Sequence, residues 1–252
     1  MKRSIYITIL SLIILGLVLS ACASKPEEAT IKVATDATWP PFEYVDEDTK
    51  DIIGFDIDLM NAIAEEAGLE IEYVNIGWDA LLAGMSECQF DASISAMTIT
   101  EERKQSFNFS DPYLPSGQII AVRIENTDIN SPEDLVGKTA GSQMGTTGNI
   151  EIENIDGVTS KPYDTVDLAY LDLMNGQIDA VVADYPTAIS FVGVYSDKLK
   201  VVGDVFTDEF YGIAVCKTNT ELLEKINSGL AAVKDSGLIP ELEQKWLTSE
   251  ME

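Results

Sequence analysis

Two hydrophobic periodicities alternate along this chain, and their order predicts its fold class. Between residues 55 and 67 apolar side chains recur at helical spacing, and Gly68 follows as a helix terminator. Shorter runs rich in β-branched residues predict strands on either side of that helix. The elements predicted for the first part of the chain are strands at 31–35 and 69–74 and helices at 55–67 and 78–85. Strands that alternate with helices are typical of an α/β fold.

The same alternation starts again after residue 113. Ser131 and Pro132 mark a helix start, because serine caps the first amides and proline fits the first helical position. The other predicted elements are strands at 117–122, near Thr139, at 178–183 and at 210–215, and helices around 170–174 and through most of 222–247. Two such sets, with apolar crossings near 114–120 and 204–212, predict two α/β lobes joined by two strands.

The stretch 91–113 (DASISAMTITEERKQSFNFSDPY) carries the strongest chemical signal. Its first part, through residue 97, predicts a short strand, and a threonine hydroxyl from Thr98 or Thr100 would cap the helix that follows. Arg103 would then lie near the carboxyl end of a buried strand, where open α/β sheets bind ligands. A guanidinium there can hold a carboxylate through two parallel hydrogen bonds. The alternative is that Arg103 only pairs with Glu101 or Glu102 on a solvated face.

The composition excludes several classes of function. The chain has a formal net charge of −27, and such a surface repels nucleic acid and anionic membranes. It contains no histidine, so a hydrolase that relies on a histidine base is excluded and zinc and copper ligands are scarce. We therefore expect no metal, no cofactor and no nucleic-acid partner. Cys88 and Cys216 could form a disulfide in an oxidising compartment or remain buried free thiols.

The N-terminal residues predict export. Lys2 and Arg3 precede an apolar stretch from Ile5 to Leu19 that is short for a membrane span. The sequence Leu-Ser-Ala-Cys at 19–22 resembles a bacterial lipobox, in which the cysteine is lipidated. We expect a lipoprotein signal peptide at 1–21, a tether at 22–29, and a lipid anchor on Cys22 at the extracytoplasmic face of the cell membrane. An ordinary signal peptide and an uncleaved anchor are the alternatives.

Several motifs occur in the order of one known family. They are ATDATWPPFEY at 34–44, GFDIDLMNAIA at 54–64, SAMTITEERK at 95–104, FSDPY at 109–113, GTTG at 145–148 and DAVVAD at 179–184. In these the chain resembles the extracytoplasmic solute-binding proteins of ABC importers, in the branch that binds polar amino acids. The resemblance covers essentially everything after residue 30 and implies a monomer that serves an ABC permease.

The resemblance implies a two-lobed, periplasmic-binding-protein-like fold. Lobe one would hold residues 30–113 and 209–252, and lobe two residues 118–204. The hinge crossings would be 114–117 and 205–208, and the cleft between the lobes would close over a solute by hinge motion.

The resemblance also implies an amino-acid clamp. Arg103 matches the arginine that holds the ligand carboxylate, with help from the Thr98 hydroxyl and the backbone of Ala96 and Thr98. In lobe two, Thr146 and Thr147 match the segment that touches the same carboxylate. Asp184 matches the aspartate that pairs with the α-ammonium group. The alternative for Asp184 is a helix cap for the segment that begins at Tyr185.

Trp39 and Trp78 match the two aromatic positions that sandwich the ligand side chain. Pro40 and Pro41 would hold Trp39 in an exposed turn. Asp36 ends the first strand, where its carboxylate could reach the distal end of a ligand. Gln143 stands where some relatives carry a lysine, which weakens any transfer from glutamine-specific relatives.

The function predicted on this basis is binding of a basic amino acid, arginine before lysine, for transport. Two tryptophan faces attract cations, and the carboxylate of Asp36 gains most from a charged donor. Glutamine is the alternative ligand, and acidic amino acids would face Asp36 with no cation nearby. A dehydratase-like or wall-lytic enzyme on the same scaffold is the alternative class, and it would need a general acid or base such as Glu43 or Asp36.

Overall fold

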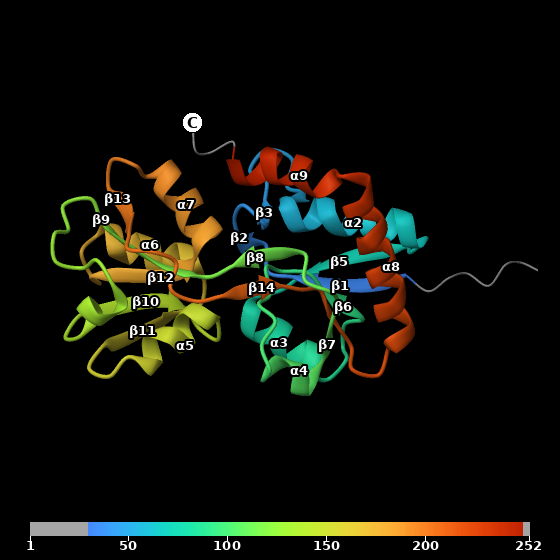
Figure 1. Ribbon diagram of the computed structural model, residues 1–252, viewed down its shortest axis with the longest axis horizontal. Coiled ribbons are helices and arrows are strands. Elements are labelled where there is room, and N and C mark those ends of the chain that lie inside the picture. The colour runs from blue at the N-terminus through green and yellow to red at the C-terminus, as the bar shows by residue number, and fades with distance from the viewer. Residues whose placement is uncertain (1–29, 249–252) are drawn as a thin grey trace, which may run out of the picture.

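The computed structural model describes residues 30–248 as two α/β lobes side by side (Figure 1). Cys22, with the predicted signal peptide and tether at 1–29, lies outside the described residues. Within 30–248, no helix combines the length and the apolar character needed to cross a membrane.

The first lobe is built on a five-stranded sheet in the order β5-β1-β6-β15-β7. Its strands are β1 (Ile31–Thr35), β5 (Ile71–Asn75), β6 (Ala92–Ser93), β7 (Asn108–Phe109) and β15 (Ala214–Val215). Strand β1 runs parallel to both β5 and β6, and β15 runs antiparallel to β6 and β7. A small sheet of β2 (Thr38–Trp39), β3 (Glu43–Val45) and β4 (Ile52–Ile53) lies beside it.

The helices of this lobe are α2 (Phe55–Ala67), α3 (Trp78–Ser86), α4 (Arg103–Ser106), α8 (Thr220–Ser236) and α9 (Leu238–Glu243), with a π turn at Gln244–Thr248. Helix α2 follows its predicted bounds, because its apolar stripe is buried and Gly68 ends it at φ 65°. It packs closely on α8, where a Cβ on Gly229 would lie 2.7 Å from the Ile63 carbonyl oxygen.

The second lobe is built on a sheet in the order β11-β10-β12-β9-β13. Its strands are β9 (Gln118–Arg123), β10 (Thr139–Gln143), β11 (Thr159–Tyr163), β12 (Ala180–Asp184) and β13 (Leu199–Val202). Its helices are α5 (Thr147–Asn154), α6 (Val166–Met174) and α7 (Tyr185–Val194), with a 3-10 turn at Pro132–Leu135. Strand β12 is buried throughout, as its apolar run predicts.

Two antiparallel strands connect the lobes. Strands β8 (Leu114–Ser116) and β14 (Glu209–Tyr211) pair with each other and lie at the centre of Figure 1, between the two large sheets. Gly117 follows β8, and a Cβ there would lie 2.4 Å from the Thr207 carbonyl oxygen. Only glycine permits this close approach of the two connections.

Two expectations about local structure are wrong. The strand predicted through residue 97 ends at Ser93, and the chain then turns at Ala96, which has φ 43°. The strand predicted at 210–215 is broken: Phe210 pairs with Pro115 between the lobes, and Ala214 pairs with Ser93 in the first sheet. One strand cannot serve two sheets without this break. The expectation that most of 222–247 is helical is confirmed, with one break between α8 and α9 at Gly237, which has φ 79°.

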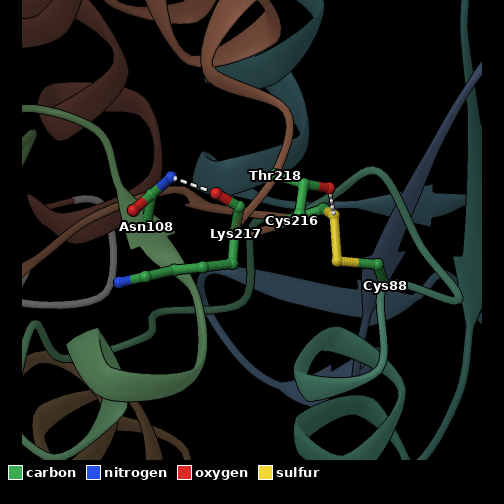
Figure 2. Close-up of a disulfide and its surroundings, with 5 residues drawn as sticks. All are labelled: Cys88, Asn108, Cys216, Lys217 and Thr218. Carbon is green, nitrogen blue, oxygen red and sulfur yellow. Dashed lines mark hydrogen bonds between the residues drawn. A yellow bond between two sulfur atoms is a disulfide. The ribbon is translucent and has the colours of Figure 1, made fainter.

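Cys88 and Cys216 form a disulfide, so the free-thiol alternative is wrong (Figure 2). Cys88 follows helix α3, and Cys216 follows strand β15, 128 residues later. The bond therefore joins two parts of the first lobe that are separated in sequence by the entire second lobe.

Candidate functional site

A small cavity lies between the lobes. It is lined by Asp36, Trp39, Glu43, Trp78, Ser95, Ala96, Thr98, Arg103, Gln143, Thr146, Thr147 and Asp184. All ten residues predicted from the sequence are in this set, together with Glu43 and Ser95. The tertiary structure thus gathers the predicted residues around one space.

Strand ends position three of the charged and polar side chains in this set. Asp36 follows β1, Gln143 ends β10, and Asp184 ends β12. Each strand is parallel to a neighbour, so the polar residues at their carboxyl ends emerge at the same edge of each sheet. The two edges face each other across the cavity. Their side chains form two hydrogen-bond networks, which we call the arginine end and the acidic end.

The arginine end comprises Thr98, Arg103, Thr147 and Asp184. Arg103 Nη1 donates to the Thr98 carbonyl oxygen at 2.9 Å, and Nη2 donates to the Gly145 carbonyl oxygen in the second lobe at 3.1 Å. Its guanidinium carbon lies 5.2 Å from the centre of the Trp78 ring. Burial lowers the pKa of Arg103 to about 10, so the group stays charged at neutral pH.

Arg103 does not pair with its neighbouring glutamates. Glu101 instead pairs with Lys104, at 2.7 Å. None of the ion pairs in the described part of the chain includes Arg103. The alternative of a purely solvated ion pair is therefore wrong, and the arginine end presents a cation to the cavity.

Asp184 is the buried carboxylate that the second lobe contributes to the arginine end. Gln118 Nε2 donates to its Oδ1 at 2.8 Å. Burial, and next the negative charge of Glu209, raise the pKa of Asp184 to about 7. Helix α7 begins at the next residue, but the Asp184 side chain forms no cap hydrogen bond to it, so the cap alternative is wrong.

The acidic end comprises Asp36, Glu43, Ser95 and Gln143. Asp36 Oδ2 accepts from Gln143 Nε2 at 2.9 Å, and Oδ1 accepts from the Thr38 hydroxyl at 2.9 Å. Gln143 Nε2 also donates to the Asp164 carbonyl oxygen at 3.0 Å. Burial raises the pKa of Asp36, while the Gln143 and Thr38 hydrogen bonds favour its charged form.

Glu43 and Ser95 were not among the predicted site residues. The Ser95 hydroxyl donates to Glu43 Oε1 at 2.9 Å and accepts from the Asp36 amide at 3.0 Å. Burial and the nearby Asp56 carboxylate raise the pKa of Glu43 well above its usual range, so it is the protonated member of that pair. The sequence signal for Glu43 was its position in the motif at 34–44, which also contains Asp36 and Trp39.

Both predicted tryptophans line the cavity. Trp39 lies in strand β2 and is 6% exposed, so the expected exposed turn is wrong. Its ring packs into the core of the first lobe with one side toward the cavity. Trp78, at the start of α3, is 7% exposed and supports the Arg103 guanidinium. The aromatic walls are therefore set by core packing.

Glu209 is a further acidic residue that the sequence did not single out. It begins the connecting strand β14 and is 8% exposed. The Thr98 and Thr147 hydroxyls donate to its Oε2 at 2.8 and 2.9 Å. Among residues 30–248, no group of three or more His, Cys, Asp or Glu side chains could hold a metal ion.

Comparison with known proteins identifies related chains. A model of the bacterial extracellular solute-binding proteins, family 3, matches residues 31–249. The L-cystine-binding protein TcyJ of Escherichia coli (strain K12) is 32% identical over 227 residues, which make up 89% of this chain and 85% of that protein.

Two solved structures share the fold at higher identity. A mutant of ArgBP from T. maritima matches with a TM-score of 0.82 and 43% identity, over 87% of this chain and 96% of that one. An ancestral arginine-binding protein bound to glutamine matches with a TM-score of 0.82 and 42% identity, over 86% of this chain and 97% of that one. These relatives are binding proteins and not enzymes.

Proposed function

This chain belongs to family 3 of the bacterial extracellular solute-binding proteins, and on that premise we propose that it captures a basic L-amino acid, arginine before lysine. It is an amino-acid-binding component of the ABC-transporter type and not an enzyme. We propose in particular which ligand the protein binds, which residues bind it and how the lobes close. The dehydratase-like alternative is set aside, because the relatives bind their solutes without converting them.

The arginine end suits the backbone of an amino acid. Arg103 supplies a half-buried cation for the α-carboxylate, and Ala96, Thr98 and Thr147 border the same space. Asp184 supplies a carboxylate for the α-ammonium group. Because Arg103 and Asp184 belong to different lobes, both contacts can form together only when the lobes are closed.

The observation that carries the choice of side chain is the buried Asp36 carboxylate at the acidic end, whose neighbours Gln143 and Ser95 donate their side-chain hydrogens within the protein. Both amide hydrogens of Gln143 are donated, to Asp36 and to the Asp164 carbonyl oxygen. The Ser95 hydroxyl hydrogen is donated to Glu43. What this end offers a ligand is acceptors, chiefly the Asp36 carboxylate. A guanidinium or alkylammonium group brings only donors and a positive charge, so it complements these acceptors.

The aromatic walls support the same choice. Trp39 and Trp78 line the cavity with their rings, and the negative face of an indole attracts a cation by about 2 kcal/mol when both are desolvated. A planar guanidinium can also stack against such a ring. Arginine therefore fits this space better than lysine does.

Other amino acids fit less well. Glutamate, which no relative named above is said to bind, would bring a second carboxylate to the acidic end, where it would face Asp36. Glutamine is the second candidate, since an ancestral arginine-binding protein was solved with glutamine bound. Its amide could donate to Asp36, but it would bring no positive charge to that carboxylate.

We extend the proposal to the location and motion of the protein. Cys22 would carry the lipid that anchors the chain outside the membrane, and an ABC permease would receive the ligand. The lobes, with the boundaries expected from the sequence, would close by bending at the expected crossings 114–117 and 205–208, which include strand β8 and directly precede strand β14. The protein would work as a monomer.

Calorimetric titration of refolded, ligand-stripped protein against the common L-amino acids tests the ligand. We expect the tightest binding with L-arginine, weaker binding with L-lysine, and no heat with L-glutamate. Agmatine, which has the guanidinium but no carboxylate, and D-arginine are matched controls that should bind far more weakly. Tight binding of glutamine or cystine, without heat from arginine or lysine, would overturn the basic ligand and leave the amino-acid clamp intact.

A further inference from the structure

Two threonines of the proposed carboxylate clamp meet across the lobes. Thr98 belongs to the first lobe and Thr147 to the second, and their hydroxyl oxygens lie 3.5 Å apart. Both hydroxyls donate to one atom, Glu209 Oε2, at 2.8 and 2.9 Å. Glu209 thus joins two residues that only the closed arrangement brings together.

The direction of these hydrogen bonds is determined by their partners. Gln118 Nε2 donates to the Thr147 oxygen at 3.0 Å, so the single Thr147 hydroxyl hydrogen is directed at Glu209. A carboxylate is an acceptor only, so Thr98 must likewise be the donor in its bond to Glu209. In this arrangement neither hydroxyl hydrogen is available to a ligand carboxylate. The clamp would then use the Arg103 guanidinium and backbone N–H groups.

Glu209 acts from outside the ligand cavity. It is not among the residues that line that cavity, but it borders a second hollow together with Thr98 and Thr147, which line both. Its other oxygen, Oε1, accepts from the Thr207 hydroxyl at 2.7 Å. Glu209 pairs with Ser116 in the connecting strands, so its backbone is placed where the lobes move relative to each other.

We propose that Glu209 is a positioning residue that latches the two halves of the carboxylate clamp. By accepting from Thr98 and Thr147 at one oxygen, it holds the lobes in register and aims the clamp backbone at the cavity. The latch needs no ligand, so it populates the closed form of the empty protein. Its role in ligand affinity rests on the proposed function, but its effect on the empty protein does not.

The test compares Glu209→Ala and Glu209→Gln with wild type. Small-angle scattering of the ligand-free protein should show a larger radius of gyration for Glu209→Ala, because the closed fraction is lost. Saturating L-arginine should restore the wild-type radius, and the Kd for L-arginine should rise about tenfold, since affinity scales with the closed fraction. Glu209→Gln should recover most of both properties, because its amide oxygen can still accept from both threonines.

Asp208→Asn is the matched control. Asp208 is the exposed neighbour of Glu209, and its substitution removes one negative charge, as Glu209→Gln does. It should behave as wild type. Equal ligand-free radii for Glu209→Ala and wild type would overturn the latch, as would a Glu209→Gln variant as open as Glu209→Ala. If no amino acid binds, the proposed function fails, while ligand-free scattering still decides the latch. Thr147→Val, which removes one donor and keeps Glu209, should also expand the ligand-free protein.

Discussion

Gln143 Nε2, in the second lobe, donates a 2.9 Å hydrogen bond to Asp36 Oδ2, in the first lobe. Both side chains are buried, and both line the cavity between the lobes. This hydrogen bond closes the cavity at the acidic end. At the arginine end, the hydrogen bond from Arg103 Nη2 to the Gly145 carbonyl oxygen closes it in the same way. The ligand cavity is thus bounded at each end by a hydrogen bond that spans the lobes.

Removing the charge of Asp36 should change the ligand preference. Asp36→Asn keeps an oxygen that can accept from Gln143 but loses the partner of a cationic side chain. Loss of a buried charge partner costs about 2 to 5 kcal/mol, so the Kd for L-arginine should rise roughly 30-fold or more. Binding of L-glutamine should be unchanged or improved. Calorimetry measures both, with the exposed Asp197→Asn as control, and an unaltered Kd for arginine would contradict the assignment of the acidic end.

Removing Arg103 should prevent ligand-driven closure. In Arg103→Ala the ligand carboxylate has no cation, so affinity for any amino acid should fall by roughly 30-fold or more. Scattering should then show no compaction when amino acid is added. Lys104→Ala is the control, because Lys104 is exposed and, within residues 30–248, forms its ion pair with Glu101. Wild-type affinity in Arg103→Ala would mean that the clamp is assigned to the wrong residue.

Ligand affinity should weaken as pH falls. Asp184 has a pKa of about 7 in the empty cavity, raised by burial. The ligand ammonium group binds its ionised form, so binding releases a proton, and the Kd for L-arginine should be about tenfold higher at pH 6 than at pH 8. Asp184→Asn should bind weakly with little pH dependence. Asp56 also has a pKa of about 7. A pH slope that persists in Asp184→Asn would therefore assign the proton to another group.

Removing the disulfide should affect stability and leave binding unchanged. The bond between Cys88 and Cys216 closes a loop with a sequence separation of 128, which restricts the unfolded chain. The double variant Cys88→Ser, Cys216→Ser should lose about 2 to 5 kcal/mol of unfolding free energy, measured with denaturant. Neither cysteine lines the ligand cavity, so the Kd for L-arginine should match wild type. A large loss of affinity would show that the bond also positions the binding residues.

Lipid on Cys22 should determine membrane association. Each buried methylene of an acyl chain contributes about 0.8 kcal/mol, and a diacyl-modified cysteine carries two chains. Cys22→Ser should move the protein from the membrane fraction to the soluble fraction. The control variant Cys88→Ser should remain in the membrane fraction. Fractionation with immunodetection measures this, and membrane retention of Cys22→Ser would contradict a lipid anchor.

Local patterns predict the helices and the buried strands of this protein well. Helix α2 follows its apolar stripe and ends at Gly68. Strand β12 follows its apolar run. The failures occur where the chain leaves one sheet for another, as at Phe210 to Val215, because apolar alternation is the same on both sides of Gly212 and does not reveal the change of partner.

The sequence by itself predicted ten of the twelve residues that line the cavity, all except Glu43 and Ser95. Asp36, Gln143 and Asp184 end strands, and residues at strand ends face the cleft wherever those strands belong to parallel sheets. The sequence also carried the family motifs that assign a role to each residue.

Only the tertiary structure decided how these residues are joined. The hydrogen bond from Thr98 to Glu209 joins residues 111 positions apart in the sequence, and the hydrogen bond from Gln143 to Asp36 joins residues 107 positions apart. The same holds for the disulfide, which the sequence left open. Hydrogen bonds and pKa shifts of this kind depend on distances and burial that are created when distant segments pack together. No local pattern in the chain encodes them.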